Sequence, residues 1–278
     1  MHVLWVNEAA DFVGGCEQYI FNTVRLLRDR GVRSTLLYDC SKPFSEGFVE
    51  IFDHAFPMLD IPVQLRETNP DLIYIHRLAG RKVLLPFIGT GYPALRFFHD
   101  YQIFCPREHR YTTIGLKTCR KPIGLRCYPC LGVVNRSDTK LGFRFNFVGS
   151  LRAAIRENQR LDGYVIGSQY MADLIAAHGF DSRRTHVVPL YALPPRAIPE
   201  KPREPDLFFF AGQLIRSKGL DTLLHAMAAA KGPSRLFIAG QGRQEAMFRA
   251  LSHDLGLENR VTFLGRIPHE DLAEWYSR

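Results

Sequence analysis

Long apolar runs are missing from this sequence. None reaches the roughly 18–20 residues that a helix needs to cross a lipid bilayer, although 46% of the 278 residues are hydrophobic, enough to fill buried cores. The N-terminal stretch MHVLWVNEAADFVGG has no basic segment and no small-residue cleavage site, so we do not expect a signal peptide. We therefore expect a cytoplasmic protein, with the inner face of the membrane as an alternative location.

Acidic residues are scarce between residues 101 and 160. This stretch holds three of them, Glu108, Asp138 and Glu157, against 12 lysines and arginines, which gives it a net charge of +9. The rest of the chain carries −1, so one region accounts for the whole basic surplus of +8. A lipid surface, a polyphosphate substrate or a nucleic acid would suit such a region, and so would a solvated surface without a partner.

The glycine pattern G-x-G-x-x-G is also absent after the first apolar stretch, which disfavours a nicotinamide dehydrogenase. What is present is an alternation of apolar strands and amphipathic helices, which predicts an α/β protein with doubly wound parallel sheets. Ser168 is placed to cap a helix. We expect strands at 2–6, 34–39, 71–76, 94–100, 162–168, 185–190, 207–211, 235–239 and 261–264, and helices at 16–31, 169–179, 217–230, 243–255 and 269–276.

Six prolines between Pro189 and Pro205 predict an extended linker at 191–205. We expect Rossmann-like domains on either side, at 1–190 and 206–278, with ligands bound between them at the carboxyl ends of the strands. The second half has only 73 residues, whereas such a domain typically has about 100–150. We therefore expect the chain to stop within that domain.

The stretch FFFAGQLIRSKGLDTLL (208–224) predicts a buried strand, a glycine turn and a helix opening at Ser217. Arg216 and Lys218 then stand where the helix dipole is already positive, which costs stability unless an anion meets them. A bound diphosphate would explain the two cations. A surface turn with solvated charges is the alternative interpretation.

Several stretches resemble, in the right order, glycosyltransferase family 4, which has the two-Rossmann glycosyltransferase-B fold. In the second half these are AGQLIRSKGLDTLLHAM, RLFIAGQG and ENRVTFLGRIPHEDLAEWY; in the first half they are VGGCEQYIFNTVRLLRDRG, RFFHDYQIFCPR and VIGSQYMADLIAAHGF. Together they cover nearly the whole chain. The resemblance implies an acceptor-side domain at 1–190, with a cysteine-rich insertion at 101–135, and a partial donor domain at 206–278.

The resemblance also implies roles for single residues. Lys218 matches the lysine that binds the donor diphosphate, and His99 matches a histidine near the transferred sugar that Asp100 could orient. Arg216 is a second candidate cation, because Gln213 stands where the family has arginine. The other matching positions are Gly14 and Gly15 beside the donor phosphate, Glu17 on the acceptor side, and Gly240 and Gly242 near the nucleotide. An ordinary tight turn and a structural histidine are the alternatives.

A retaining hexosyltransferase is the activity that the resemblance implies. It would move a sugar from a nucleotide-sugar donor to a saccharide or lipid-linked acceptor, in polysaccharide or glycolipid biosynthesis, without a catalytic metal. The family's pair of glutamates with seven residues between them is missing: no glutamate here has another eight positions on. We therefore expect the chain as given to bind donor poorly and to transfer slowly or not at all.

Four cysteines lie in the basic region, at Cys105, Cys119, Cys127 and Cys130. The C-x-x-C pair of the last two suits a tetrahedral metal ion, so structural zinc is our first interpretation, with His99 or His109 able to replace one ligand. Free thiols, a disulfide or an iron–sulfur site are the alternatives. A zinc-containing nucleic-acid-binding protein is the second functional hypothesis, although the segment lacks a zinc-finger helix pattern and we expect no nucleic-acid partner.

Three arginines, Arg152, Arg156 and Arg160, repeat every four residues and would line one helix face. The aromatic residues Phe143, Phe145 and Phe147 lie just ahead of them. Such a face would attract an anionic membrane that carries a lipid-linked acceptor. The alternative is a solvated helix with its phenylalanines in the core.

Overall fold

The computed structural model describes residues 1–278 apart from 79, 114, 116, 137–142, 192–202 and 269–270. The chain divides into two compact units, Met1–Ala192 and Leu193–Arg278. Most of the expected linker at 191–205 lies outside the described residues, and so does Asp138.

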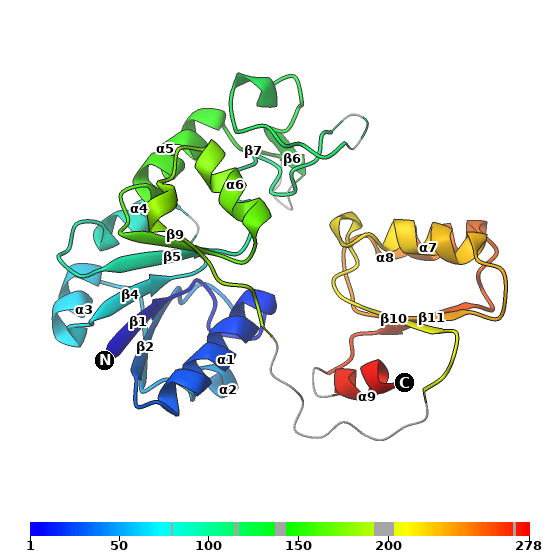
Figure 1. Cartoon of the computed structure of the whole chain (residues 1–278), viewed down its shortest axis with the longest axis horizontal. Helices are drawn as coiled ribbons and strands as arrows, with labels where there is room; N and C mark the ends of the chain where they lie inside the picture. The colour runs from blue at the N-terminus through cyan, green and yellow to red at the C-terminus, as the bar shows by residue number, and fades with distance from the viewer. Residues whose placement is uncertain (79, 114, 116, 137–142, 192–202, 269–270) are drawn as a thin grey trace. The chain divides into compact units, whose positions relative to one another are not determined.

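A parallel seven-stranded sheet forms the first unit, in the order β3-β2-β1-β4-β5-β8-β9 (Figure 1). The doubly wound α/β architecture predicted from the sequence is thereby confirmed. The central strand β1 is buried along its whole length, as a strand covered by helices on both faces must be. The strands are β1 (His2–Val6), β2 (Arg33–Tyr38), β3 (His54–Pro57), β4 (Leu72–Ile75), β5 (Ala94–Phe98), β8 (Gly163–Ile166) and β9 (Thr185–Val187).

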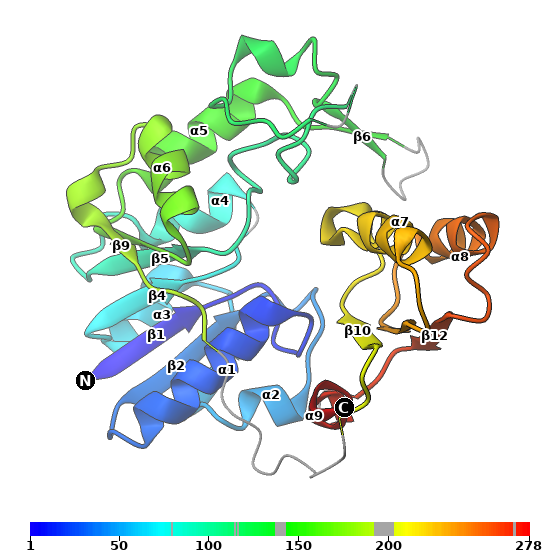
Figure 2. The ribbon, with the colours of Figure 1, turned by 45° about the vertical axis from the view of Figure 1, so that its right-hand side comes forward.

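Helices cover both faces of this sheet (Figures 1 and 2). On one face α1 (Gly15–Arg28) and α2 (Glu46–Val49) pack against β1 and β2 in one apolar cluster. The other face carries a larger cluster, to which the remaining helices contribute. These helices are α3 (Ile61–Thr68), α4 (Arg81–Leu84), α5 (Val148–Asn158) and α6 (Gln169–Ala177).

Smaller elements complete the first unit. A two-stranded antiparallel ribbon joins β6 (Val134–Arg136) to β7 (Phe143–Phe145) within the basic region. Single 3-10 turns lie at η1 (Leu85–Phe87), η2 (Leu125–Cys127) and η3 (Ser182–Arg184). The expected cap is confirmed, because the Ser168 hydroxyl accepts a hydrogen bond from the Met171 amide at 3.3 Å.

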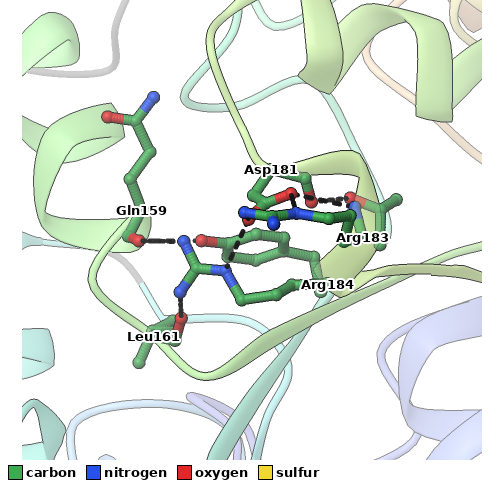
Figure 3. Close-up of polar contacts among 7 residues, drawn as sticks. Gln159, Leu161, Asp181, Arg183 and Arg184 are labelled. Atoms are coloured by element: carbon green, nitrogen blue, oxygen red, sulfur yellow. Dashed lines mark hydrogen bonds and ion pairs between the residues drawn. The ribbon is translucent and has the colours of Figure 1, made fainter.

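Polar contacts of Arg184 connect the amino ends of β8 and β9, the last two strands of the sheet (Figure 3). The Arg184 guanidinium donates to the carbonyl oxygens of Leu161 (2.9 Å) and Gln159 (3.3 Å), and it pairs with the Asp181 carboxylate at 3.6 Å. It also lies over the Tyr164 ring, 5.4 Å from its centre. These contacts join the turn before β8 to the turn before β9, at the edge opposite the carboxyl ends of the strands.

In the second unit a parallel sheet has the order β10-β11-β12 (Leu207–Ala211, Arg235–Ala239, Val261–Gly265). Helices α7 (Leu220–Ala229) and α8 (Glu245–Asp254) share an apolar cluster with β11 and β12. Helix α9 (Leu272–Ser277) contacts the opposite face, where the Trp275 ring lies 5.4 Å from Phe209 and 5.1 Å from Phe237.

Two expectations for this unit are wrong. The strand of three phenylalanines is not fully buried, because β10 lies at the edge of the described sheet and Phe208 is 49% exposed. The helix does not open at Ser217 either. Gly219 takes a left-handed backbone conformation (φ 75°) that separates a 3-10 turn, η4 (Arg216–Lys218), from the start of α7 at Leu220.

Candidate functional site

The carboxyl ends of β1, β4 and β5 bring several polar side chains together in the first unit. The strand order changes direction between β1 and β4, and in open α/β sheets ligands bind outside the strands at such a point. Asn7 directly follows β1, His76 directly follows β4 and His99 directly follows β5. Helix α1 begins at the same edge with Gly15.

Asn7 ties these ends together. It is fully buried, and its side-chain oxygen accepts from the Arg77 amide at 3.1 Å. Its amide nitrogen donates to the Ala9 carbonyl (2.8 Å) and to Oε1 of Glu17 (3.2 Å). The predicted acceptor-side residue Glu17 is buried as well, and its Oε2 has no hydrogen-bond partner within the described residues. A buried carboxylate oxygen without a partner is costly, and a Cβ added at the exposed Gly14 would lie 3.8 Å from this atom.

His99 lies at this edge as predicted, but its hydrogen-bond partner differs from the expected one. The carboxylate of Asp100 accepts from the Gln102 amide at 2.9 Å. The ring of His99 instead contacts His76, with His76 Nδ1 and His99 Nε2 2.8 Å apart. His76 was missed in the sequence, and the available signal was its place immediately after a strand, like that of His99.

Burial keeps both imidazoles neutral. The pKa of His99 falls to about 4, because burial disfavours the charged ring and the Arg77 and Arg96 charges repel it. Burial also holds the pKa of His76 well below its usual range, with His99 and Arg96 adding to the effect. Arg96 itself is buried on β5, and burial lowers its pKa to about 10.

The predicted glycine loop leaves open space beside these side chains. Gly14 and Gly15 are exposed, and Gly14 has an extended backbone that any residue could adopt. A Cβ atom added at Gly15 would meet nothing within 4 Å, and one at Gly14 would first meet Glu17 at 3.8 Å. Folding of the chain therefore does not require glycine at position 15. A residue without a side chain at this position would instead leave room for a ligand close to the backbone.

One group in the first unit has the spacing of metal ligands. Donor atoms of Cys16, His76 and His99 all lie within 4.8 Å of one another. Two of these side chains already share a hydrogen bond, and the neighbouring Arg77 and Arg96 charges oppose a bound cation. Burial, followed by the Glu17 charge, raises the pKa of the Cys16 thiol, so the thiolate that a metal needs is disfavoured. The arrangement therefore fits a hydrogen-bonded histidine pair better than a metal centre.

The turn after β10 holds the predicted donor residues Gln213, Arg216 and Lys218, all of which are exposed. Arg216 already has an anion, because its Nε lies 3.3 Å from the Asp221 carboxylate in the first turn of α7. The prediction that Arg216 and Lys218 both lack an anion within the chain is therefore wrong for Arg216. Lys218 has no side-chain partner among the residues that the structure describes, so it is the cation that an anionic ligand could reach.

The predicted glycines Gly240 and Gly242 have a packing role. The loop that carries them runs against the backbone of Gly212–Leu214, and the Leu214 amide donates to the Gln241 carbonyl at 3.0 Å. A Cβ at Gly240 would stand 1.9 Å from the Gly212 oxygen, and one at Gly242 would stand 2.5 Å from the Leu214 oxygen. These glycines thus let the loops after β10 and β11 lie side by side.

The four predicted metal cysteines are unbridged and partly buried. Burial raises the pKa of Cys127, and the thiols of Cys105, Cys119 and Cys130 act on it in the same direction, so the four side chains share one neighbourhood. Among the described residues, however, the sulfur atoms of these four cysteines do not form a group in which all donor atoms lie within 4.8 Å of one another, as metal ligands would.

The basic helix differs from its prediction. Helix α5 ends at Asn158, so Arg160 lies beyond it and pairs with Glu157 at 3.1 Å, while Arg152 and Arg156 are exposed on the helix. Phe145 and Phe147 are each 58% exposed and their rings stack 6.2 Å apart. The alternative that placed these two rings in the core is therefore wrong.

Comparisons with known proteins identify the second unit. Residues 195–278 match the family model described as glycosyl transferases group 1. This segment is a group 1 glycosyltransferase domain. A comparison of the sequence with curated proteins finds no match. No described helix combines the length and apolar character that crossing a bilayer requires.

Several solved structures share the fold of the chain. The lipopolysaccharide outer core galactosyltransferase WaaB aligns with a TM-score of 0.58 and 16% identity over 99% of this chain and 72% of its own. Anabaena Alr3699/HepE, solved with UDP and glucose, aligns at 0.60 and 16% over 96% and 70%. TarM aligns at 0.64 and 8% over 96% and 77%. The architecture is therefore that of the glycosyltransferase-B fold.

Proposed function

We propose that the chain acts as a retaining glycosyltransferase on a nucleotide-sugar donor. The observation that carries this proposal is the exposed Lys218, without a side-chain partner among the described residues, inside the group 1 glycosyltransferase domain. Breaking the bond between sugar and diphosphate leaves negative charge on the departing phosphate. A fixed cation beside that phosphate stabilises the transition state. HepE has been solved with UDP-glucose, which supports a UDP-sugar as the first donor to test.

The first unit supplies the acceptor side in this proposal. His99 meets the transferred sugar, the buried Glu17 lies on the acceptor side behind Gly14, and Gly14 and Gly15 give the ligands room. The acceptor is a saccharide or lipid-linked sugar, in the synthesis of a polysaccharide or glycolipid. Exposed aromatic and basic side chains at the start of α5 support a lipid-linked acceptor held at an anionic membrane.

Donor binding tests the proposal directly. The full chain is titrated with UDP-, GDP- and ADP-glucose by calorimetry, and release of the nucleotide diphosphate is followed in the presence of each. We expect one donor, with UDP-glucose tried first, to bind weakly and to be cleaved slowly, because the family's glutamate pair is missing from this sequence. Failure of all three nucleotide sugars to bind would overturn the proposed function.

Structural zinc at the four cysteines is a separate proposal. Their shared neighbourhood supports it, and zinc would draw the thiols together in a segment with little core of its own. Elemental analysis of protein purified without added metal should find about one zinc ion per chain, and none after all four cysteines are replaced by serine. Four titratable thiols at these positions in a zinc-free and iron-free chain would end this proposal.

A further inference from the structure

His76 is a buried polar side chain to which the proposed reaction assigns no role. Its side chain is 1% exposed, and its ring stacks on Trp5 with the centres 5.4 Å apart. Tyr74 packs against it from the same strand, at 4.4 Å between ring centres. The contact with His99 at 2.8 Å uses Nδ1, and Nε2 has no hydrogen-bond partner among the described residues.

Both rings are neutral near pH 7, so their shared hydrogen bond holds a single proton. The groups around the pair are the cations Arg77 and Arg96, which keep the rings uncharged, the thiol of Cys16, the phenol of Tyr19 and the Asp100 carboxylate. A neutral imidazole carries one N–H and one bare nitrogen. The direction of the His76–His99 bond therefore decides the tautomer of both rings.

The unpartnered nitrogen of His76 selects that direction. If His99 donated from Nε2, His76 would carry its proton on Nε2 and bury an N–H without an acceptor. Orphaned buried N–H groups are rarer in proteins than under-satisfied acceptors. With the proton on Nδ1, His76 donates to His99 and leaves only a bare lone pair without a partner. His99 must then carry its own proton on Nδ1.

We propose that His76 is a positioning residue, which donates from Nδ1 to Nε2 of His99 and thereby holds the Nδ1–H of His99 ready to donate to the sugar. The inference rests on the proposed function only in taking the sugar as the partner of His99. Packing of His76 on Trp5 and Tyr74 fixes the donor, so His99 needs no reorganisation when substrate arrives.

Nitrogen NMR of the histidine rings in the full chain tests the arrangement without turnover. We expect His99 protonated on Nδ1, and a scalar coupling across the bond between His76 Nδ1 and His99 Nε2. In His76→Phe, which keeps an aromatic ring in place, the coupling should vanish and His99 should lose its single tautomer. A wild-type His99 protonated on Nε2 overturns the inference, and this spectrum decides even if the variant fails to fold.

Kinetics separate positioning from simple stability. His76→Phe should lower kcat by about 10–100-fold with little change in the KM for donor, and His54→Phe, at an exposed histidine on β3, should change neither. His76→Asn should recover kcat only as far as the NMR shows His99 protonated on Nδ1; recovery without that tautomer contradicts the inference. A wild-type chain with the expected spectra but no transfer would reject the proposed function and leave the histidine pair standing.

Discussion

Gly15 is the residue at which folding and function separate most cleanly. Its added Cβ would meet no atom within 4 Å, so Gly15→Ala should leave the free energy of unfolding of the first unit almost unchanged. The same methyl group would crowd a ligand at the start of α1, and sugar transfer should fall by about 10–100-fold. Denaturant unfolding and steady-state kinetics measure the two effects. A variant that transfers normally would show that no ligand approaches this loop.

The buried histidines predict a pH dependence of stability. The pKa of His99 is about 4 in the folded chain, against about 6.5 in an unfolded one. The unfolded state therefore binds more protons between these values, and stability is full above pH 6.5 and falls as the pH drops towards 4. The loss from His99 is on the order of 3 kcal/mol, and His76 adds to it in the same direction.

Trp5 fluorescence in a Trp275→Phe background reports unfolding of the first unit alone, because these are the two tryptophans of the chain. His99→Gln should flatten the dependence between pH 6.5 and 4, whereas His54→Gln, at an exposed site, should leave it as it was. An unchanged slope in His99→Gln would mean that this ring is not held neutral by the fold.

Among single residues, the sequence predicts those site residues that belong to a motif contained in one short stretch. Lys218, Gly14 and Gly15 could be proposed from the stretches that contain them. The partner of His99 could not, because His76 stands 23 positions away and meets it only when β4 pairs with β5. The ion pair of Arg216 with Asp221 was missed because it depends on where α7 begins.

At the scale of elements, the two glycine-bearing loops of the second unit carry a clear prediction. Gly240 has φ 134° and would place a Cβ 1.9 Å from the Gly212 oxygen, so Gly240→Ala should destabilise this unit by at least about 2 kcal/mol. Gly212→Ala is the matched control, since its Cβ would make only ordinary contacts at 3.7 Å with Phe210. Denaturation followed by Trp275 fluorescence in a Trp5→Phe background measures both. Equal stability of the two variants would contradict the close packing of the loops.

Long apolar segments were easy to predict as elements, and short ones were not. Strands such as β1 and β11 are apolar along most of their length, so their positions followed from the sequence. The four-residue elements α2 and β3 have too little pattern to recognise. The start of α7 was misplaced because Gly219 takes a left-handed conformation that helical periodicity alone does not reveal.

At the scale of the whole molecule, the exposed side chains around α5 predict membrane association. The exposed Phe147 directly precedes the first residue of this helix, and the ring of Phe145 stacks on it. Arg152 and Arg156 are exposed on the helix itself. Anionic lipid attracts such cations at roughly 1 kcal/mol each, so the double change Arg152→Gln and Arg156→Gln should weaken binding to phosphatidylserine vesicles about tenfold or more. Arg160→Gln is the matched control, because Glu157 already pairs with that charge.

Co-sedimentation with vesicles at low and high salt reads this out. Binding should need the anionic lipid, weaken as salt rises and depend on the two helical arginines more than on Arg160. A protein that stays in the supernatant with anionic vesicles at low salt would point to a soluble acceptor instead.

The measurement closest to the central claim compares Lys218→Ala with the unchanged chain in release of UDP from UDP-glucose. Lys218 is exposed, so the second unit should keep its stability, while kcat/KM should fall by about 10²–10³-fold because the leaving diphosphate loses its cation. Lys231→Ala, at another exposed lysine of the same unit, is the control and should behave like the unchanged chain. Unaltered kcat/KM and donor affinity in Lys218→Ala would contradict the assignment of this turn to the donor diphosphate.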